Sequence, residues 1–132
     1  MPVSSSRYNR VTIILLGILA MLGPIGHDIF IPSIPIIADG LNVTANQVSV
    51  SISAIFLGNA IGTLFHGPLA DRFGRKLVIL WVLGLYALAA IIGAFSPNVE
   101  VLIVSRFFQG LALAGGRVLS AAVARDLFES DK

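Results

Sequence analysis

The sequence predicts an all-α membrane protein with four transmembrane helices, and its composition and charge pattern support this fold class. The chain has 132 residues, of which 56% are hydrophobic and 12% are charged. Soluble domains contain about 45–50% apolar and about 25% charged residues, so lipid is the expected solvent. Roughly twenty apolar residues cross a bilayer as a helix. We therefore expect spans at residues 11–38, 48–69, 77–95 and 101–123.

A short charged run separates the second and third spans. Residues 40–70 and 77–99 contain no Asp, Glu, Lys or Arg, and most of the charge between them lies in Asp71-Arg72-Phe-Gly74-Arg75-Lys76. We expect a tight loop at residues 67–76. Glycine suits a turn that needs positive φ, and basic residues hold a loop on the cytoplasmic side.

This run resembles a known family signature. The pattern Gly-x-Leu-Ala-Asp-Arg-x-Gly-Arg-Lys is similar, without a mismatch, to the loop between helices 2 and 3 of the major facilitator superfamily. The resemblance implies that the chain supplies helices 1–4 of a twelve-helix fold. It also implies a cytoplasmic gate loop made of Gly67, Asp71, Arg72, Gly74, Arg75 and Lys76. A generic basic loop that only sets orientation is the alternative interpretation.

The first span follows a short polar segment, residues 1–10, with Arg7 and Arg10 just before the apolar run. A secretory signal peptide could begin this way, but the apolar residues continue to Ala38 without a cleavage site of small residues. A first transmembrane span is therefore favoured. Gly23-Pro24, Gly26, Pro32 and Pro35 predict that this helix is broken, because proline frees backbone carbonyls that neighbouring groups must satisfy.

Asp28 is the acidic residue of the first span and is preceded by His27. A carboxylate at membrane depth costs about 2.5–3.5 kcal/mol, so it is usually functional or paired. Residues 22–35 resemble helix 1 of the drug:proton antiporters of the bicyclomycin/chloramphenicol-resistance type. The resemblance implies that Asp28 handles protons and cationic substrates. Alternatively, Asp28 reaches interfacial water or a positive residue, and His27 either acts with it or merely lines the cavity.

The second span has a smooth side and a polar side. Gly58 and Gly62 lie four residues apart and predict close helix packing. Asn59 is expected to form an interhelical hydrogen bond, with substrate contact as the alternative, and His66 is expected near the cytoplasmic interface. The third span carries only Trp81 and Tyr86 as amphipathic anchors and predicts a lipid-facing scaffold.

The fourth span contains two arginines. Helical spacing places Arg106, Gln109 and Gly110 on one stripe with Arg117, and this stripe must face protein or water. The run Arg106-Phe-Phe-Gln-Gly resembles the helix 4 signature of the same superfamily. It implies that Arg106 lies near the proton site and influences its pKa, with a structural ion pair as the alternative. We expect Arg117 either to line the cavity or to extend toward the cytoplasmic face.

The basic residues predict the orientation of the chain. Seven of the nine Lys and Arg lie at residues 1–10, 67–76 and 124–132, whereas the loops 39–47 and 96–100 hold none. The bias of positive charge toward the cytoplasm therefore places both termini there, in what we expect to be a bacterial inner membrane. Arg125 or Asp126 is expected to pair with the charged loop and close a cytoplasmic gate.

These observations favour a proton-coupled exporter that works by alternating access. We expect protons as the coupling ion without another cofactor, and no metal site. The expected partners are the lipid bilayer, a small cationic or lipophilic substrate and the remaining helices of the fold. The net charge of +2 comes from the loops, and so no nucleic-acid surface is expected. Neither a nucleophile–base pair nor a phosphate loop suggests an enzyme.

Two other functions stay open. A truncated polypeptide would insert and pack with partner helices without transport, because half of an alternating-access machine has no opposing bundle. A self-assembled pair of four-helix chains is less favoured, because such exporters resemble a pattern with Glu in the first span. Export rather than uptake rests on the first-span resemblance alone.

Overall fold

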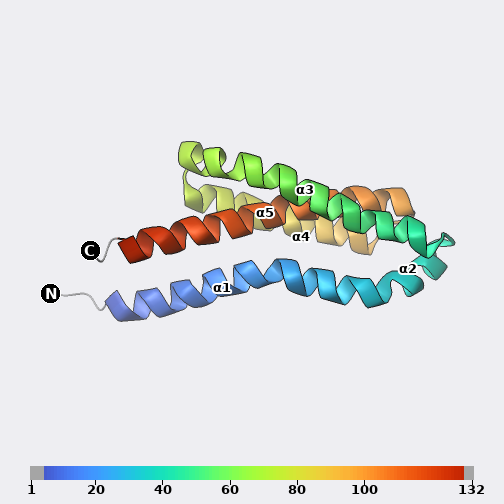
Figure 1. The fold of residues 1–132 in the computed structure, drawn as a ribbon, viewed down its shortest axis with the longest axis horizontal. Coiled ribbons are helices and arrows are strands. Elements are labelled where there is room, and N and C mark those ends of the chain that lie inside the picture. Colours follow the sequence, from blue (N-terminus) through green and yellow to red (C-terminus); the bar gives the residue numbers. More distant parts are fainter. Residues whose placement is uncertain (1–4, 130–132) are drawn as a thin grey trace.

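The computed structural model describes the backbone of residues 5–129 and the side chains of residues 10–126. Arg7, Lys132 and most of the predicted terminal segments 1–10 and 124–132 lie outside the described side chains. Four helices in the described part are long and apolar enough to cross a membrane. The protein therefore has the expected all-α class with four candidate spans, arranged as an elongated bundle (Figure 1).

The first span is one apolar rod with a single interruption. Helix α1 (Ser5–Phe30) is followed by a 3-10 helix, η1 (Ile31–Ser33), and by α2 (Ile34–Leu41). The expected break is confirmed at Pro32, but the expectation is wrong at Gly23-Pro24 and Gly26, because Pro24 lies inside a continuous α1. Proline removes only one hydrogen bond there, whereas Pro32 coincides with the change of helix type. Pro35 stands at the start of α2, where its missing N–H is not needed.

Helix α3 (Ala45–Phe73) begins at a capping box. The Thr44 hydroxyl accepts from the Gln47 backbone N–H at 3.3 Å, and the Gln47 side chain accepts from the Thr44 N–H at 3.0 Å. Two N–H groups at the helix start are thereby satisfied. The helix then continues past Pro68 to Phe73.

The connection to helix α4 (Arg75–Ala94) is one residue, Gly74, with φ of 87°. The expectation of a loop at residues 67–76 is therefore wrong for all but this position. The described helices continue through both sides of the charged run. Within residues 67–76, only Gly74 adopts a positive φ, which residues with a side chain rarely adopt.

Helix α5 (Val99–Glu129) is the longest element and extends beyond the expected span at both ends. It begins beside Asn98, whose side-chain oxygen accepts from the Val101 N–H at 2.9 Å. In Figure 1, α3 lies on one side of α5 and α1 runs along the other, while α4 crosses behind α5. The α3–α5 contact is the most extensive in the bundle.

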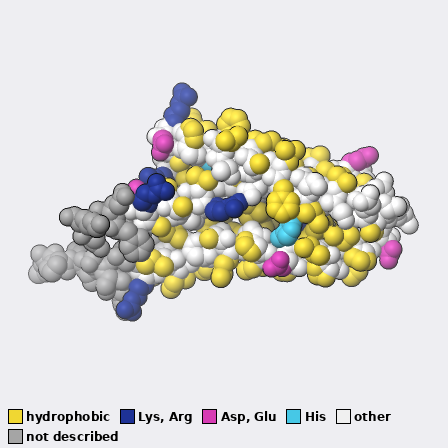
Figure 2. Space-filling view, in the orientation of Figure 1, with side chains coloured by type: hydrophobic (Ala, Val, Ile, Leu, Met, Phe, Trp, Pro, Cys, Tyr) yellow, Lys and Arg dark blue, Asp and Glu magenta, His cyan; other side chains and the backbone are white. Residues whose placement is uncertain are grey.

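The two ends of the bundle differ in charge. Both chain ends and the α3–α4 turn lie at one end in Figure 1, and the α2–α3 and α4–α5 connections lie at the other. In Figure 2, the dark blue basic side chains concentrate toward the first end, while the far end shows only acidic ones. Asp39 and Glu100 belong to the elements of that far end. This segregation agrees with the expected orientation of the chain.

Glycines bring α3 and α5 into backbone contact. A Cβ on Gly58 would overlap the Phe107 carbonyl oxygen, and one on Gly110 would overlap the Ile55 carbonyl oxygen. A Cβ on Gly62 would lie 2.6 Å from the Leu111 carbonyl oxygen. The expected close packing at Gly58 and Gly62 is confirmed, and the absence of side chains is what permits the approach.

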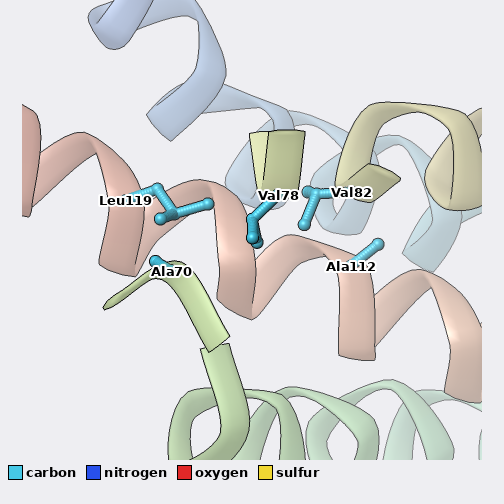
Figure 3. Close-up of a cluster of buried hydrophobic side chains, with 5 residues drawn as sticks. All are labelled: Ala70, Val78, Val82, Ala112 and Leu119. Atoms are coloured by element: carbon cyan, nitrogen blue, oxygen red, sulfur yellow. The ribbon is translucent and has the colours of Figure 1, made fainter. Parts of the chain in front are cut away.

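Small apolar clusters fill the remaining space. One cluster joins α3, α4 and α5 through buried side chains of Ala70, Val78, Val82, Ala112 and Leu119 (Figure 3). A second lies near the α2–α3 connection and contains Phe30, Ala38, Val48 and Leu102. Much of the apolar surface stays outside, and Trp81 is 71% exposed. Exposed apolar side chains of this extent agree with lipid as the solvent.

The α3–α5 contact gives a first prediction. Gly58→Val should lower the midpoint of thermal unfolding in detergent, because the added branched side chain collides with backbone; overpacking costs about 1–3 kcal/mol or more. Gly84→Val is the matched control, since nothing beyond its chain neighbours and its own helix backbone lies within 4 Å of a Cβ built there. Trp81 fluorescence would report both transitions. Equal midpoints for the two variants would contradict the packing described.

Candidate functional site

A cavity of about 550 Å³ lies between the first span and helices α4 and α5. Its wall combines apolar side chains with a small set of polar or aromatic groups, namely Phe30, Tyr86, Ser96, Arg106 and Gln109. Tyr86 was expected as an interfacial anchor. Instead it is half-buried, and its hydroxyl lies 3.2 Å from where a Cβ on Gly26 would stand. This tyrosine therefore fills the space between α4 and α1.

Arg106 is held in the cavity by a ring and an amide. Its guanidinium carbon lies 3.8 Å from the centroid of the Phe30 ring, and Nη1 donates to Gln109 Oε1 at 3.0 Å. Gln109 is buried, with 6% of its surface exposed. A cation over an aromatic face is attracted by the ring quadrupole. No carboxylate among the described residues pairs with Arg106, so ring and amide take the place of a counter-ion.

Asp28 lies on another side of the first span. Gly26 and Phe30 face the cavity, and two residues of helix turn the side chain by about 200°. Asp28 is accordingly exposed, and within the described part of the chain it forms neither a hydrogen bond nor an ion pair. The structure thus does not bring Asp28 and Arg106 together.

A second polar group bridges α1, α3 and α5. The His27 ring meets the Phe56 ring edge-on, with centroids 5.2 Å apart, and Arg117 Nη2 donates to Asn59 Oδ1 at 2.9 Å. Phe56 and Asn59 are one turn apart on α3, so they share a side of that helix. The expected interhelical bond of Asn59 is confirmed. We use the name polar face for His27, Asp28, Asn59 and Arg117.

Figure 2 shows this arrangement in outline. Near the middle of the visible side, a basic, a histidine and an acidic side chain gather within an otherwise apolar surface. Asn59 and Arg117 were each identified as polar positions from the sequence, but a hydrogen bond between them was not predicted. Their pairing depends on how α3 and α5 cross, which the contacts of Gly58 and Gly110 determine.

His66 differs from its expected place. It was expected at the interface, but it is buried, with 8% of its surface exposed, and its Nδ1 lies 2.6 Å from the Gly62 carbonyl oxygen. A Cβ on Gly115 would approach its Nε2 to 2.7 Å. The glycine in α5 thus makes room for an imidazole from α3, which places His66 among the packing residues.

The charged run contributes one ion pair. Arg75 Nη1 forms an ion pair with Asp126 and also donates to the Ala122 carbonyl oxygen at 3.3 Å. Pairing between this run and the end of α5 was expected, and the structure assigns it to Arg75 and Asp126. Arg72 instead lies 5.6 Å from the Phe73 ring centroid. Of the remaining predicted gate residues, Gly74 makes the turn that places Arg75 at the start of α4.

Long apolar helices that hold polar groups between them define an α-helical integral membrane protein. The chain belongs to the Major Facilitator Superfamily, whose family model matches residues 10–132. It is therefore part of a family of small-molecule transporters rather than of enzymes. The resemblance seen in residues 67–76 and 106–110 is confirmed at the level of the family.

Several curated proteins are similar to the chain. An uncharacterised MFS-type transporter, YdgK, of Bacillus subtilis is 43% identical over 86% of the chain. A bicyclomycin resistance protein homolog of Haemophilus influenzae is 41% identical, and multidrug resistance protein D of Escherichia coli is 32% identical, each over 92% of the chain. The chain spans only 28–31% of the length of these relatives.

The Arg75–Asp126 pair gives a second prediction. Its side chains are 35% and 59% exposed, and exposed pairs contribute about 0.2–1 kcal/mol. A double-mutant cycle with Arg75→Gln and Asp126→Asn should yield a coupling in that range that falls as salt is added. The cycle of Arg72→Gln with Asp126→Asn is the control and should show no coupling. A coupling that does not respond to salt would contradict an ionic contact.

Proposed function

We propose that this chain forms part of a proton-coupled exporter that moves small, cationic or lipophilic molecules by alternating access. The family is a transporter family, and relatives carry the names bicyclomycin resistance and multidrug resistance. The observation that carries the proposal is the exposed carboxylate of Asp28 inside an apolar span.

The depth of Asp28 supports this role. The residue stands about 18 positions after Arg10 and about 13 before Leu41, or roughly 27 Å and 20 Å from the span ends at 1.5 Å per residue. A carboxylate so deep that faces lipid is disfavoured. Its exposed side is therefore proposed to face a water-filled pathway or a second bundle. The relatives, of which the chain spans 28–31%, are long enough to contain one.

Arg106 and Gln109 are proposed to tune proton binding from the other side of α1. A nearby cation favours the ionised form of a carboxylate, whereas desolvation favours the neutral form. Two glycines take part in the contact between α1 and α5: a Cβ on Gly116 would lie 3.4 Å from Leu19, and one on Gly23 would lie 3.9 Å from Leu113. We propose that α1 shifts during transport, which would change the distance between Asp28 and Arg106.

The Arg75–Asp126 pair is proposed as a latch on the cytoplasmic side. It joins the start of α4 to the end of α5 at the basic end of the bundle. An exposed pair is weak enough to open and close during a transport cycle. By the positive-inside rule, this end faces the cytoplasm. The relatives from Bacillus, Haemophilus and Escherichia make a bacterial cytoplasmic membrane the proposed location.

The alternative is a membrane polypeptide that packs with partner helices and transports nothing. The chain spans 28–31% of the length of its relatives, so the length of the natural polypeptide decides between the two functions. The intact mass of the polypeptide in its native membrane separates the two cases. A mass near 13.9 kDa favours the alternative, and a mass about three times larger favours the exporter.

Proton coupling gives a third prediction. In inverted membrane vesicles that contain the natural polypeptide, Asp28→Asn should reduce substrate-induced proton release to background, because the amide cannot exchange a proton. Asp39→Asn is the matched control, since Asp39 is exposed near the end of α2. It should keep normal coupling. Efflux by the Asp28 variant with an unchanged pH dependence would remove Asp28 from the mechanism.

A further inference from the structure

The direction of the Arg117 side chain is unexpected for a membrane helix. The ends of α3 and α5 are level with each other, because Asp126 pairs with Arg75, close to the α3 end at Phe73. Arg117 stands about 9 residues before Asp126, whereas Asn59 stands about 14 residues before Phe73. At 1.5 Å per residue, these positions lie roughly 14 Å and 21 Å from that end. The guanidinium therefore points deeper into the span.

This direction contradicts simple snorkelling. An arginine that only avoids lipid would extend toward the nearer aqueous end, yet Arg117 turns away from it to meet Asn59. A positive charge directed toward membrane depth needs water or an anionic partner. The described residues supply one neutral acceptor, Asn59 Oδ1 at 2.9 Å, and no carboxylate.

Arg117 and the histidine that precedes Asp28 are anchored one turn apart on the same helix, α3. Asn59 anchors Arg117 and Phe56 anchors His27, and these two anchors are one turn apart on α3, about 4.5 Å along its axis. Asp28 is the next residue after His27. One bond to Asn59 leaves other guanidinium N–H groups available, and their planar fork matches a carboxylate.

We propose that Arg117, oriented by Asn59, is an anion-recognition residue of the transport pathway, and that the substrates include zwitterions, which carry a carboxylate beside the cationic amine. Arg117 receives the carboxylate of the substrate, and the Asp28 side of the polar face receives its amine. This inference rests on the proposed export function, but it concerns which molecules bind rather than how protons are coupled. Asn59 acts as a positioning residue, since it holds the guanidinium at the correct depth.

The test compares two fluorescent probes that differ only in the anionic group, Nε-dansyl-lysine and its methyl ester. Binding to the purified natural polypeptide is followed by dansyl fluorescence. Charge-assisted hydrogen bonds should make the zwitterion bind about tenfold more tightly than the ester. Arg117→Gln should remove this preference by weakening the zwitterion about tenfold, with the ester changed by less than about twofold.

Three further variants make the test specific. Arg117→Lys keeps the charge without the planar fork of the guanidinium and should retain part of the preference for the zwitterion. This variant keeps the test decisive if Arg117→Gln folds poorly. Asn59→Ala should lower the preference while the charge remains. Arg125→Gln removes one charge from the exposed end of the same helix and should change nothing.

Equal affinities of the wild type for both probes would overturn the proposal, as would failure of both to bind or equal weakening of both by Arg117→Gln. The outcome is separate from that of proton coupling. If Asp28→Asn left transport coupled while Arg117→Gln still abolished the preference for the zwitterion, the coupling role would fail and the anion site would stand.

Discussion

The backbone contact between α3 and α5 is the constraint on which the other features depend. Because Gly58, Gly62 and Gly110 lack side chains, the two helices cross at contact distance and fix which residues lie level with each other. That register pairs Asn59 with Arg117 and creates the space for His66 against Gly115. In lipid, apolar burial does not drive helices together, so such close packing supplies much of the attraction.

The first span divides the polar groups into two environments. Phe30 points into the cavity and covers Arg106, while Asp28 and His27 point to the polar face. The two sides are separated by the body of one helix, so the position of α1 sets the distance between Asp28 and Arg106.

The sequence predicts the class, the number of spans and the family, because lipid solvation leaves a strong compositional record and the charged run is distinctive. It also predicts the close packing at Gly58 and Gly62. The sequence does not predict how two elements are placed relative to each other. It also fails locally at Gly67 and Pro68. The helix through these residues was mistaken for a loop, because glycine, proline and charge usually mark turns, whereas within residues 67–76 of the structure only Gly74 departs from helix.

The candidate site was likewise predicted only in part from the sequence. Chemical type singled out Asp28, Arg106 and Arg117, since charges are costly in apolar spans. The partners of these charges depend on side-chain direction, which spacing alone leaves open. The acceptors Gln109 and Asn59 were both identified as polar positions, but the Phe30 ring under Arg106 was not. In an apolar run, the sequence does not distinguish a phenylalanine that faces a cavity from one that faces lipid.

The single-residue connection at Gly74 has a mechanical consequence. With one non-helical residue between them, α3 and α4 have no slack, so neither helix can slide along its axis without pulling the other. They can only change the angle between them, as two rods on a common joint. The Arg75 contact with α5 lies beside that joint, where a small angular change moves it little. The far ends of the rods would sweep the larger arc.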